Sequence, residues 1–215
     1  LKKAGLQDDY AYLGEEETCC GDPDRRLGEE SKFQDLALKN IELFKKYGVK
    51  NIITICPHGY NTFKNEYPKI DPWMKGVSIK HYSEVIHELL EKEKIKVKPS
   101  SEVLTIHDPC YLSRHNSIIE PQRFIVKKVG FLKEPSRSGK NTFCCGAGGS
   151  NYWYEVKEKT KISHIRFNEL KETGASTIVV LCPFCNAMLN DASTVLSDGK
   201  IKVKDIAEVV KDNLV

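Results

Sequence analysis

The sequence of 215 residues lacks a long apolar run, a strong excess of either charge and a secretory leader. Its apolar stretches, such as residues 178–182, fall far short of the roughly 20 residues that a membrane-spanning helix needs. With 33 Lys and Arg against 30 Asp and Glu, the formal net charge is only +3, which removes the electrostatic case for a nucleic-acid-binding protein. No apolar segment follows residues 1–5, as a secretory signal would require. The length allows one large or two small globular domains with a real core.

What the sequence does have is eight cysteines, and their arrangement argues against a disulfide scaffold. A chain of this size can bury a core without disulfides, and nothing points to secretion. Cysteines occur twice as adjacent pairs, at residues 19–20 and 144–145, and once as Cys-x-x-Cys, at Cys182 and Cys185. Neighbouring cysteines cannot easily pair with each other, but both can face one multi-iron cofactor. We therefore expect metal or cluster binding.

An internal repeat organises the chain. The apolar run and Cys-Pro step of residues 46–57 recur at residues 172–183, and the Cys-Cys-Gly triplet of residues 19–21 recurs at residues 144–146. Similar tails follow both copies. Three matches in the same order, at a nearly constant offset of about 125 residues, predict a duplicated unit.

The hydrophobic pattern predicts an α/β fold, with two pseudo-symmetric cysteine-rich units whose short parallel sheets are flanked by helices. Three apolar, β-branched runs are typical of buried strands: residues 51–55, 103–106 and 176–181. Helical periodicity covers four segments: residues 31–47, 82–94, 152–173 and 204–214. Gly48 and Gly174 are expected to end helices in the left-handed conformation.

The domain organisation follows from the repeat. The lysine-rich residues 94–101 are the expected linker, so that residues 1–98 form a first unit and residues 99–215 a second. In the second unit Cys110 precedes the Cys-Cys pair, and its counterpart in the first unit would fall before Leu1. The sequence also begins without Met. We therefore expect the first unit to be incomplete, lacking an upstream cysteine, and the chain to be a piece of a longer polypeptide.

The second unit is complete, and its spacing suggests a ligand set. In a parallel sheet, the loops that follow the strands meet at one edge, where ligand sites form. Four cysteines suffice for zinc or a cubane cluster, so the fifth is surplus for either. Gly146, Gly148 and Gly149 can bring backbone N–H groups close to bound sulfides. Cys182 followed by Pro183 predicts a helix N-terminus with further N–H donors.

Several phrases of the sequence resemble the CCG-domain (cysteine-rich domain) iron–sulfur oxidoreductases, which include heterodisulfide reductase B- and D-type subunits and related respiratory-complex subunits. The phrases are residues 18–28, 56–58, 61–68, 107–110 and 144–149. The resemblance implies a noncubane [4Fe-4S] cluster held by five cysteines: Cys110, Cys144, Cys145, Cys182 and Cys185. It also implies a redox partner protein or an upstream ferredoxin-like module as the source of electrons.

The first unit departs from the family pattern. Gly59 stands where the second cysteine of Cys-x-x-Cys belongs, so Cys19, Cys20 and Cys56 cannot supply five ligands. These three cysteines are expected either to bind a second iron–sulfur cluster completed by upstream residues, to act as redox thiols, or to be buried as small hydrophobic residues. With one intact unit, cleavage of a substrate between two clusters is in doubt.

The leading hypothesis is reduction of a disulfide or a protein-borne trisulfide at the cluster. The alternative is a quinone- or 2-hydroxyacid-linked oxidoreductase that uses the cluster as an electron relay. A thiol–disulfide protein built on Cys182 and Cys185 and a structural zinc module are further possibilities. The expected location is the cytoplasm, or the cytoplasmic face of a membrane complex reached only through partner subunits, with no nucleic acid bound.

Other side chains carry smaller expectations. His58, beside Cys56, is a candidate proton donor to a leaving thiolate, and His107, which ends a predicted strand, is a candidate proton relay or supporting residue. Four aromatic residues are expected in the core: Trp73, Tyr152, Trp153 and Tyr154.

Overall fold

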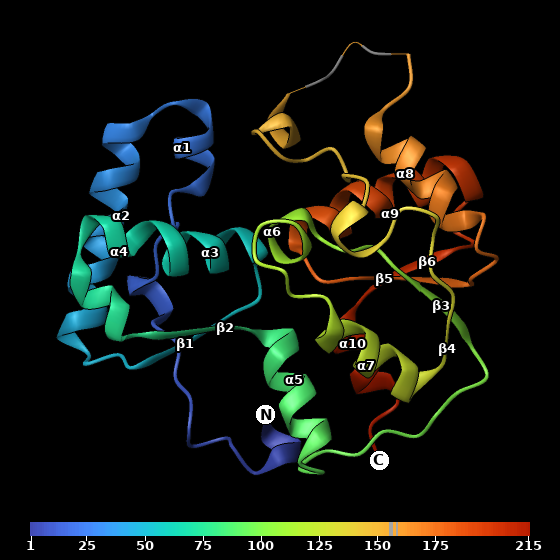
Figure 1. Ribbon diagram of the computed structural model, residues 1–215, viewed down its shortest axis with the longest axis horizontal. Helices are drawn as coiled ribbons and strands as arrows, with labels where there is room; N and C mark the ends of the chain where they lie inside the picture. The colour runs from blue at the N-terminus through green and yellow to red at the C-terminus, as the bar shows by residue number, and fades with distance from the viewer. Residues whose placement is uncertain (155–156, 158) are drawn as a thin grey trace.

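The computed structural model describes residues 1–215 except residues 155, 156 and 158, and Figure 1 shows two units side by side. Both units carry a parallel sheet. In the first unit β1 (Asn51–Thr54) pairs with β2 (Ser78–His81), and in the second the strand order is β4-β3-β5-β6. The four strands of the second sheet are β3 (Val103–Ile106), β4 (Phe131–Leu132), β5 (Thr177–Val180) and β6 (Lys202–Asp205). The predicted fold of two α/β units with short parallel sheets is confirmed.

The second unit buries its sheet between two layers of helices. The central strand β5 is buried along its whole length. Val179 packs toward α7 (Glu120–Val129) and α10 (Ile206–Asp212), whereas Ile178 and Val180 pack toward α8 (Ile162–Lys171) and α9 (Pro183–Ser197). Alternate side chains of the strand therefore serve opposite faces, as expected for a parallel strand covered on both sides.

The first unit has a smaller core. Helix α2 (Glu30–Lys46) buries Phe33, Ile41 and Phe44 together with Tyr67 of α4 (Tyr67–Ile70). Three further helices complete the unit: α1 (Asp22–Leu27), α3 (Pro57–Asn61) and α5 (Tyr82–Glu91). A π-helical turn, Thr62–Glu66, joins α3 to α4. The 3₁₀ turns among the described residues are Lys2–Ala4, Gly14–Glu16, Pro72–Gly76, Gly139–Asn141 and Asn151–Trp153.

The repeat is visible in how the elements begin and end. Gly48 and Gly174 end α2 and the turn after α8 in the left-handed region, with φ of +59° and +71°. Each unit closes with a strand and a helix, β2–α5 and β6–α10, and both helices start with a capping box, formed by His81 with Glu84 and by Asp205 with Glu208.

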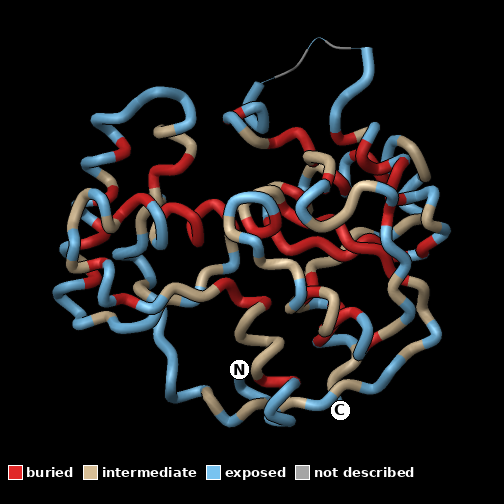
Figure 2. The backbone as a smooth tube through the Cα atoms, in the orientation of Figure 1, coloured by how far each residue is buried: buried red, intermediate tan, exposed pale blue. Residues whose placement is uncertain are grey.

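The two units touch along several elements. Helix α3 has all five residues buried and packs on α6 (Cys110–Ser113) of the second unit (Figures 1 and 2). Helix α5 packs on α7, and Tyr82 donates a hydrogen bond to Asp205 Oδ2 at 2.6 Å. The predicted linker also contacts the C-terminal segment, because Val97 bridges Leu214. This packing holds the C-terminal ends of both sheets in fixed relation.

Two predicted helices differ from the structure. The helix expected at residues 152–173 begins at Ile162, and part of the prediction falls on residues 155, 156 and 158, outside the described chain. The helix expected at residues 204–214 starts at Ile206, because Lys202–Asp205 pairs with β5 as a strand. Within the described part of the chain, no helix combines the length and the apolar character needed to span a membrane.

Candidate metal centre

The five cysteines of the second unit meet at the C-terminal edge of its sheet. Cys182 follows β5 and caps the N-terminus of α9, with Pro183 as the first helical residue, as predicted. Cys110 follows β3 and opens α6, and Cys144 and Cys145 arrive on the loop after the 3₁₀ turn at Gly139–Asn141. Three chain segments that are distant in sequence thus bring their thiols to one place.

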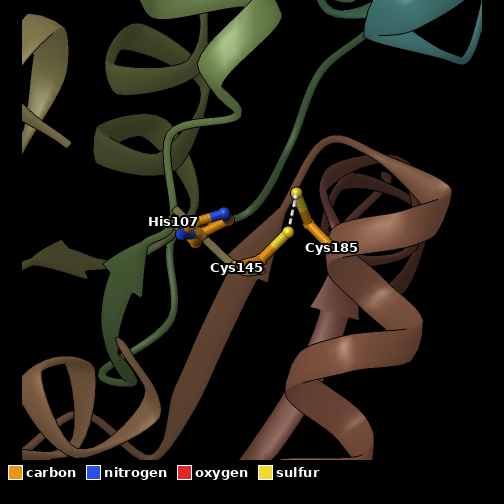
Figure 3. Close-up of side chains that lie close together, drawn as sticks. All are labelled: His107, Cys145 and Cys185. Carbon is orange, nitrogen blue, oxygen red and sulfur yellow. Dashed lines mark hydrogen bonds between the residues drawn. The ribbon is translucent and has the colours of Figure 1, made fainter. Parts of the chain in front are cut away.

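The thiols form one continuous run. Cys110 lies beside Cys144, which lies beside Cys145. Cys145 Sγ is 3.4 Å from Cys185 Sγ (Figure 3), and Cys185 lies beside Cys182. The arrangement is that of a polydentate sulfur site, with one donor more than a tetrahedral zinc ion accepts.

Neighbouring thiols shift each other's pKa in opposite directions. Hydrogen bonds from Cys110 and Cys145 hold the pKa of Cys144 far below its usual range, and contact with Cys144 raises the pKa of Cys145 to about 12. In the same way, Cys185 lowers the pKa of Cys182, while Cys145 and Cys182 raise the pKa of Cys185. Thiolates are therefore favoured at Cys144 and Cys182, and the thiolate is the form that binds soft metal ions and clusters.

The Cys-Cys-Gly turn depends on its glycine. Gly146 has φ +93°, and a Cβ there would lie 3.0 Å from Cβ of Ile162. Its N–H points to Cys144 Sγ at 3.2 Å. The first unit repeats the turn: Gly21 has φ +82°, and its N–H lies 3.4 Å from Cys19 Sγ. Only glycine fits such a left-handed, closely packed position without strain.

Asp108 fastens two of the cysteine loops together. Its buried carboxylate accepts hydrogen bonds from both Nη atoms of Arg123, each at 2.9 Å, and from the Gly139 N–H at 2.7 Å. Its backbone oxygen accepts from Thr142 Oγ1 at 3.1 Å. The buried ion pair of Asp108 and Arg123 therefore holds together the loop of Cys110 and the loop that leads to Cys144. It helps to fix the positions of these two cysteines relative to each other.

His107 lies against the site, and sequence reasoning missed the residue that holds it. His107 is buried, and one of its ring nitrogens lies within 4.8 Å of Cys145 Sγ and Cys185 Sγ (Figure 3). Arg166 of α8, whose side chain is fully buried, contacts the His107 ring, and Glu169 pairs with Arg166. Burial and the charge of Arg166 lower the pKa of His107 to about 4. A single Arg in a helical segment gives no signal of burial, so only the structure identifies this pair.

The first unit contributes Cys56 and His58 to the same place. Cys56 caps α3 after β1, as Cys182 caps α9 after β5. His58 Nδ1 is 3.7 Å from Cys56 Sγ and 3.9 Å from Cys182 Sγ, so it lies between the two units' sulfurs. Burial pushes the pKa of His58 down, but contact with Cys182 and the charge of Asp22 outweigh it, and the net shift is upward.

Cys19 and Cys20 lie on the loop before α1. Cys19 is exposed, and a hydrogen bond from Cys20 lowers its pKa to about 6. Contact with Cys19 and burial raise the pKa of Cys20. Cys56 instead contacts Cys182, so the structure divides the first unit's three cysteines between two places.

A hollow between the units adjoins the thiols. Asp22 and Arg26 are among the residues that line it, together with four rings: His58, Tyr111, Trp153 and Phe184. Arg26 is paired with Glu66 at 2.6 Å, so its charge is neutralised. The glycines expected to bind the cofactor lie near it: Gly148 and Gly149 line the hollow, next to the turn at Gly146.

The aromatic residues of the hollow correct one expectation. Tyr152, Trp153 and Tyr154 were expected in the core, but they are about half exposed, with Trp153 at 55%. Trp153 and Tyr152 pack edge-on against Phe184, between Cys182 and Cys185 in sequence. The core prediction is wrong for these three residues because they lie in and just after the short 3₁₀ turn Asn151–Trp153, beside the hollow, and not on the face of a longer helix.

Comparison with known proteins gives a family match. The family model of the CCG cysteine-rich domain matches residues 6–64 and 104–190, so that both units are covered.

Three relatives illustrate the similarity. The chain is 39% identical over 98% of its length to "EtfAB:quinone oxidoreductase" of Syntrophomonas wolfei, covering 30% of that protein. It is 38% identical over its full length to "Probable iron-sulfur-binding oxidoreductase FadF" of Bacillus subtilis, again covering 30% of it. It is 31% identical over its full length to a subunit of the "Dihydromethanophenazine:CoB--CoM heterodisulfide reductase" of Methanosarcina barkeri, covering 53% of that subunit. The chain thus spans about a third to a half of these relatives' lengths.

Proposed function

The chain belongs to the CCG cysteine-rich domain family, and from this premise we propose that it is the cluster-holding part of an iron–sulfur oxidoreductase. Five side chains would hold a [4Fe-4S] cluster of the noncubane type: Cys110, Cys144, Cys145, Cys182 and Cys185. The observation that supports this most is their continuous run of neighbouring sulfurs. A cluster bound there exchanges single electrons, and its potential is set by the hydrogen bonds and burial around it.

Backbone N–H groups around the site would stabilise the negative charge of the cysteine thiolates. The Gly146 N–H already lies 3.2 Å from Cys144 Sγ, and Gly148 and Gly149 would offer further N–H groups from the same loop. The N-terminus of α9 adds a favourable dipole at Cys182. Several thiolates in one buried place need such donors, because burial otherwise disfavours their charge.

The first candidate substrate is a planar acceptor such as a quinone, which would be reduced by two electrons and two protons in single-electron steps. The hollow is lined by the rings of His58, Tyr111, Trp153 and Phe184, and its cavity of about 20 Å³ leaves a flat ligand to bind at its mouth, against the half-exposed Trp153. Arg26 is paired with Glu66, which leaves little positive charge for an anionic substrate. The name of the relative from Syntrophomonas wolfei points in the same direction.

Reduction of a disulfide or protein-borne trisulfide is the second candidate. It is favoured by His58, whose Nδ1 lies 3.7 Å and 3.9 Å from the sulfurs of Cys56 and Cys182. A disulfide takes up two electrons and two protons to give two thiols, and the His58 imidazole is placed to hold one of those protons. The relative from Methanosarcina barkeri carries such a substrate in its name.

The cluster assignment is tested by anaerobic reconstitution, followed by iron and acid-labile sulfide analysis and electron paramagnetic resonance of the oxidised protein. We expect about four iron and four sulfide per chain. Zinc without acid-labile sulfide would identify a structural zinc module, and a redox-active Cys182–Cys185 disulfide without metal would identify a thiol–disulfide protein. Either result contradicts the proposal.

The substrate assignment is tested by reoxidation of the reduced protein. Quinone analogues, a small disulfide and a protein trisulfide are offered in parallel, and Trp153→Ala serves as the variant that opens the hollow. Faster turnover with quinones, slowed in Trp153→Ala, supports the planar acceptor. Reoxidation by sulfur substrates alone supports the second candidate. In either case electrons would come from a redox partner protein or a ferredoxin-like module, and contact with a membrane would be made by partner subunits at its cytoplasmic face.

A further inference from the structure

The side chain of Arg166 is a buried cation directly behind the cysteine site. It is 0% exposed and comes from α8, on the face opposite to α7. Its Nε donates to His107 Nδ1 at 3.0 Å, and its Nη1 donates to Glu169 Oε2 at 3.0 Å and to the Arg137 backbone oxygen at 2.9 Å. A buried charge is tolerated only when it is paired and hydrogen-bonded, and here every acceptor is supplied by the second unit.

The Arg166–His107 contact fixes the tautomer of the imidazole. A guanidinium has five N–H donors, no acceptor, and does not lose its proton in proteins. His107 Nδ1 must therefore accept the Arg166 Nε–H, and the ring proton must lie on Nε2. A second ring proton, on Nδ1, would point at the Arg166 Nε–H, and two donors cannot form a hydrogen bond with each other. The ring is therefore a neutral donor at Nε2.

The protonated nitrogen faces the thiols. Figure 3 shows one ring nitrogen of His107 turned toward the sulfurs of Cys145 and Cys185 and the other turned away. The ligating atoms of these three residues lie within 4.8 Å of one another. Nδ1 points toward Arg166 Nε, and the two ring nitrogens lie on different sides of the ring, so we assign the nitrogen on the sulfur side as Nε2.

This geometry argues against His107 as a metal ligand. A histidine that binds a metal ion offers an unprotonated nitrogen. For Nε2 to do so, its proton would have to move to Nδ1, where the Arg166 Nε–H already points. A mixed site of His107, Cys145 and Cys185 is therefore disfavoured by the residue behind it.

We propose that His107, locked as its Nε2–H tautomer by Arg166, donates a hydrogen bond to a sulfur at the Cys145–Cys185 side of the bound cluster and thereby raises its reduction potential. His107 is then a tuning residue with a fixed proton, and Arg166 is a positioning residue that acts through it. This inference rests on the proposed function, since the acceptor is a sulfur of the cluster or of its cysteine ligands. The general ground is that hydrogen bonds to cluster sulfurs stabilise the more negative, reduced state.

The first test measures the midpoint potential of the anaerobically reconstituted chain by redox titration followed by electron paramagnetic resonance. His107→Phe removes the donor while keeping a flat ring, and we expect it to lower the potential. The expected size is about a tenfold fall in the reduced-to-oxidised ratio at fixed potential, which equals ~59 mV for one electron. His107→Gln is the matched control, because its amide oxygen can accept from Arg166 while its N–H₂ faces the sulfurs; we expect its potential near the wild-type value.

The second test reads the tautomer without the cluster. Nitrogen-15 NMR of the ring nitrogens in the cluster-free chain is expected to show a protonated Nε2 and an unprotonated Nδ1. The double variant Arg166→Gln/Glu169→Gln removes both buried charges together, and we expect it to introduce the Nδ1–H form. A wild-type ring with Nδ1–H overturns the role of Arg166, even where a variant folds poorly.

The outcomes separate this inference from the proposed function. A wild-type chain that takes up no acid-labile sulfide overturns the proposed function and, with it, the acceptor of the His107 hydrogen bond. Full iron and sulfide content with equal potentials in wild type, His107→Phe and His107→Gln overturns the role of His107 alone. Loss of the cluster from both His107 variants identifies a ligand, which also contradicts a tuning donor.

Discussion

The two units share a turn and a helix start, yet they build different surroundings from them. In both, a Cys-Cys-Gly turn brings a glycine N–H to the first cysteine, at 3.4 Å in the first unit and 3.2 Å in the second. In both, a Cys-Pro step opens a helix after a parallel strand. The second unit then has Cys185, whereas Gly59 stands at the matching position of the first unit.

The helix before the repeated strand, α2 in the first unit and α8 in the second, carries a different buried side chain in each unit. Asn40 of α2 and Arg166 of α8 occupy matching places in the repeat, and both are buried. Asn40 is neutral and donates to the Cys19 backbone oxygen at 3.0 Å. Arg166 is charged and is paired with Glu169. A buried amide suffices to brace a turn with few thiols, whereas the charged pair orients His107 toward the full set.

The comparison also shows that the first unit contributes to the site of the second. Cys56 and His58 face Cys182 across the boundary between the units, and the aromatic hollow is lined from both sides. The two repeated units therefore form one site, which is lined by residues of both. The contribution of each unit to this site can be measured separately, and loss of a cysteine ligand is expected to have the largest effect.

Loss of a thiol from the second unit should remove the cluster. We expect Cys144→Ser and Cys185→Ser to lower bound iron and acid-labile sulfide to background, because each residue is in the continuous run. Cys19→Ser, in the matching turn of the first unit, is the control and should keep full iron content. Iron and sulfide analysis after reconstitution decides it. Equal losses in Cys19→Ser and Cys144→Ser would show that the units share one ligand set.

Removing the partner of the buried guanidinium should cost more stability than removing the buried amide. Glu169→Gln leaves Arg166 without a full counter-charge, and we expect a loss of about 3–5 kcal/mol in the free energy of unfolding. Asn40→Ala leaves the Cys19 carbonyl without its donor, with a loss of about 1–3 kcal/mol. Urea unfolding of the cluster-free chain measures both. Equal losses of unfolding free energy in the two variants would mean that the Arg166–Glu169 pair stabilises the fold no more than the Asn40 amide does.

The same pair gives a pH dependence. Burial raises the pKa of Glu169, but hydrogen bonds from Arg137, Ser136 and Arg166 outweigh it and lower the pKa to about 2. Because the folded value lies below the unfolded value of about 4.3, the pair stabilises the fold at higher pH. This stability is lost as the pH falls from about 4 to about 2. Urea midpoints between pH 6 and pH 2 should fall steeply for the wild type and less for Glu169→Gln; parallel curves would contradict this.

Much of this arrangement is readable from the sequence, for local reasons. Strands β1, β3 and β5 are runs of β-branched residues, and Gly48 and Gly174 mark the helix ends before two of them. The Cys-Pro step at Cys182 predicts the start of α9 correctly, and α3 begins at the matching step of the first unit. These features depend on short stretches of chain whose preferences agree with the fold.

The parts that sequence reasoning missed depend on distant contacts. Strands β2 and β6 each hold one apolar residue among polar ones and lie at sheet edges, so they lack an apolar run. Arg166 is buried because acceptors from the segments before and after β4 surround it, which no helical pattern reveals. The meeting of Cys56 with Cys182 depends on how the two units dock, and periodicity within one unit says nothing about that.

Substitution of the two glycines of the Cys-Cys-Gly turns can separate an effect on the stability of the turn from an effect on iron binding. Gly146→Ala and Gly21→Ala both force a Cβ into the left-handed region and into close contact, with Ile162 and Phe33 respectively. Each should lower the free energy of unfolding by about 1–3 kcal/mol. Only Gly146→Ala should also lower iron content, because its N–H serves a thiolate of the proposed site. Retention of full iron in Gly146→Ala would show that the turn tolerates the shift.

The smallest expected effect concerns Cys19 and Cys20, which lie apart from the five neighbouring cysteines of the second unit. Cys19 is exposed, and the hydrogen bond from Cys20 lowers its pKa to about 6, so most of it is thiolate at neutral pH. We expect iodoacetamide to modify Cys19 first in the cluster-loaded chain, with a rate that rises through pH 6 and then levels off. Cys20→Ala should slow the reaction at pH 7 by about tenfold, because the thiolate loses its donor. Peptide mapping of the labelled chain identifies the site. Protection of Cys19 only after reconstitution would place it on a cluster and make the first unit a second metal site.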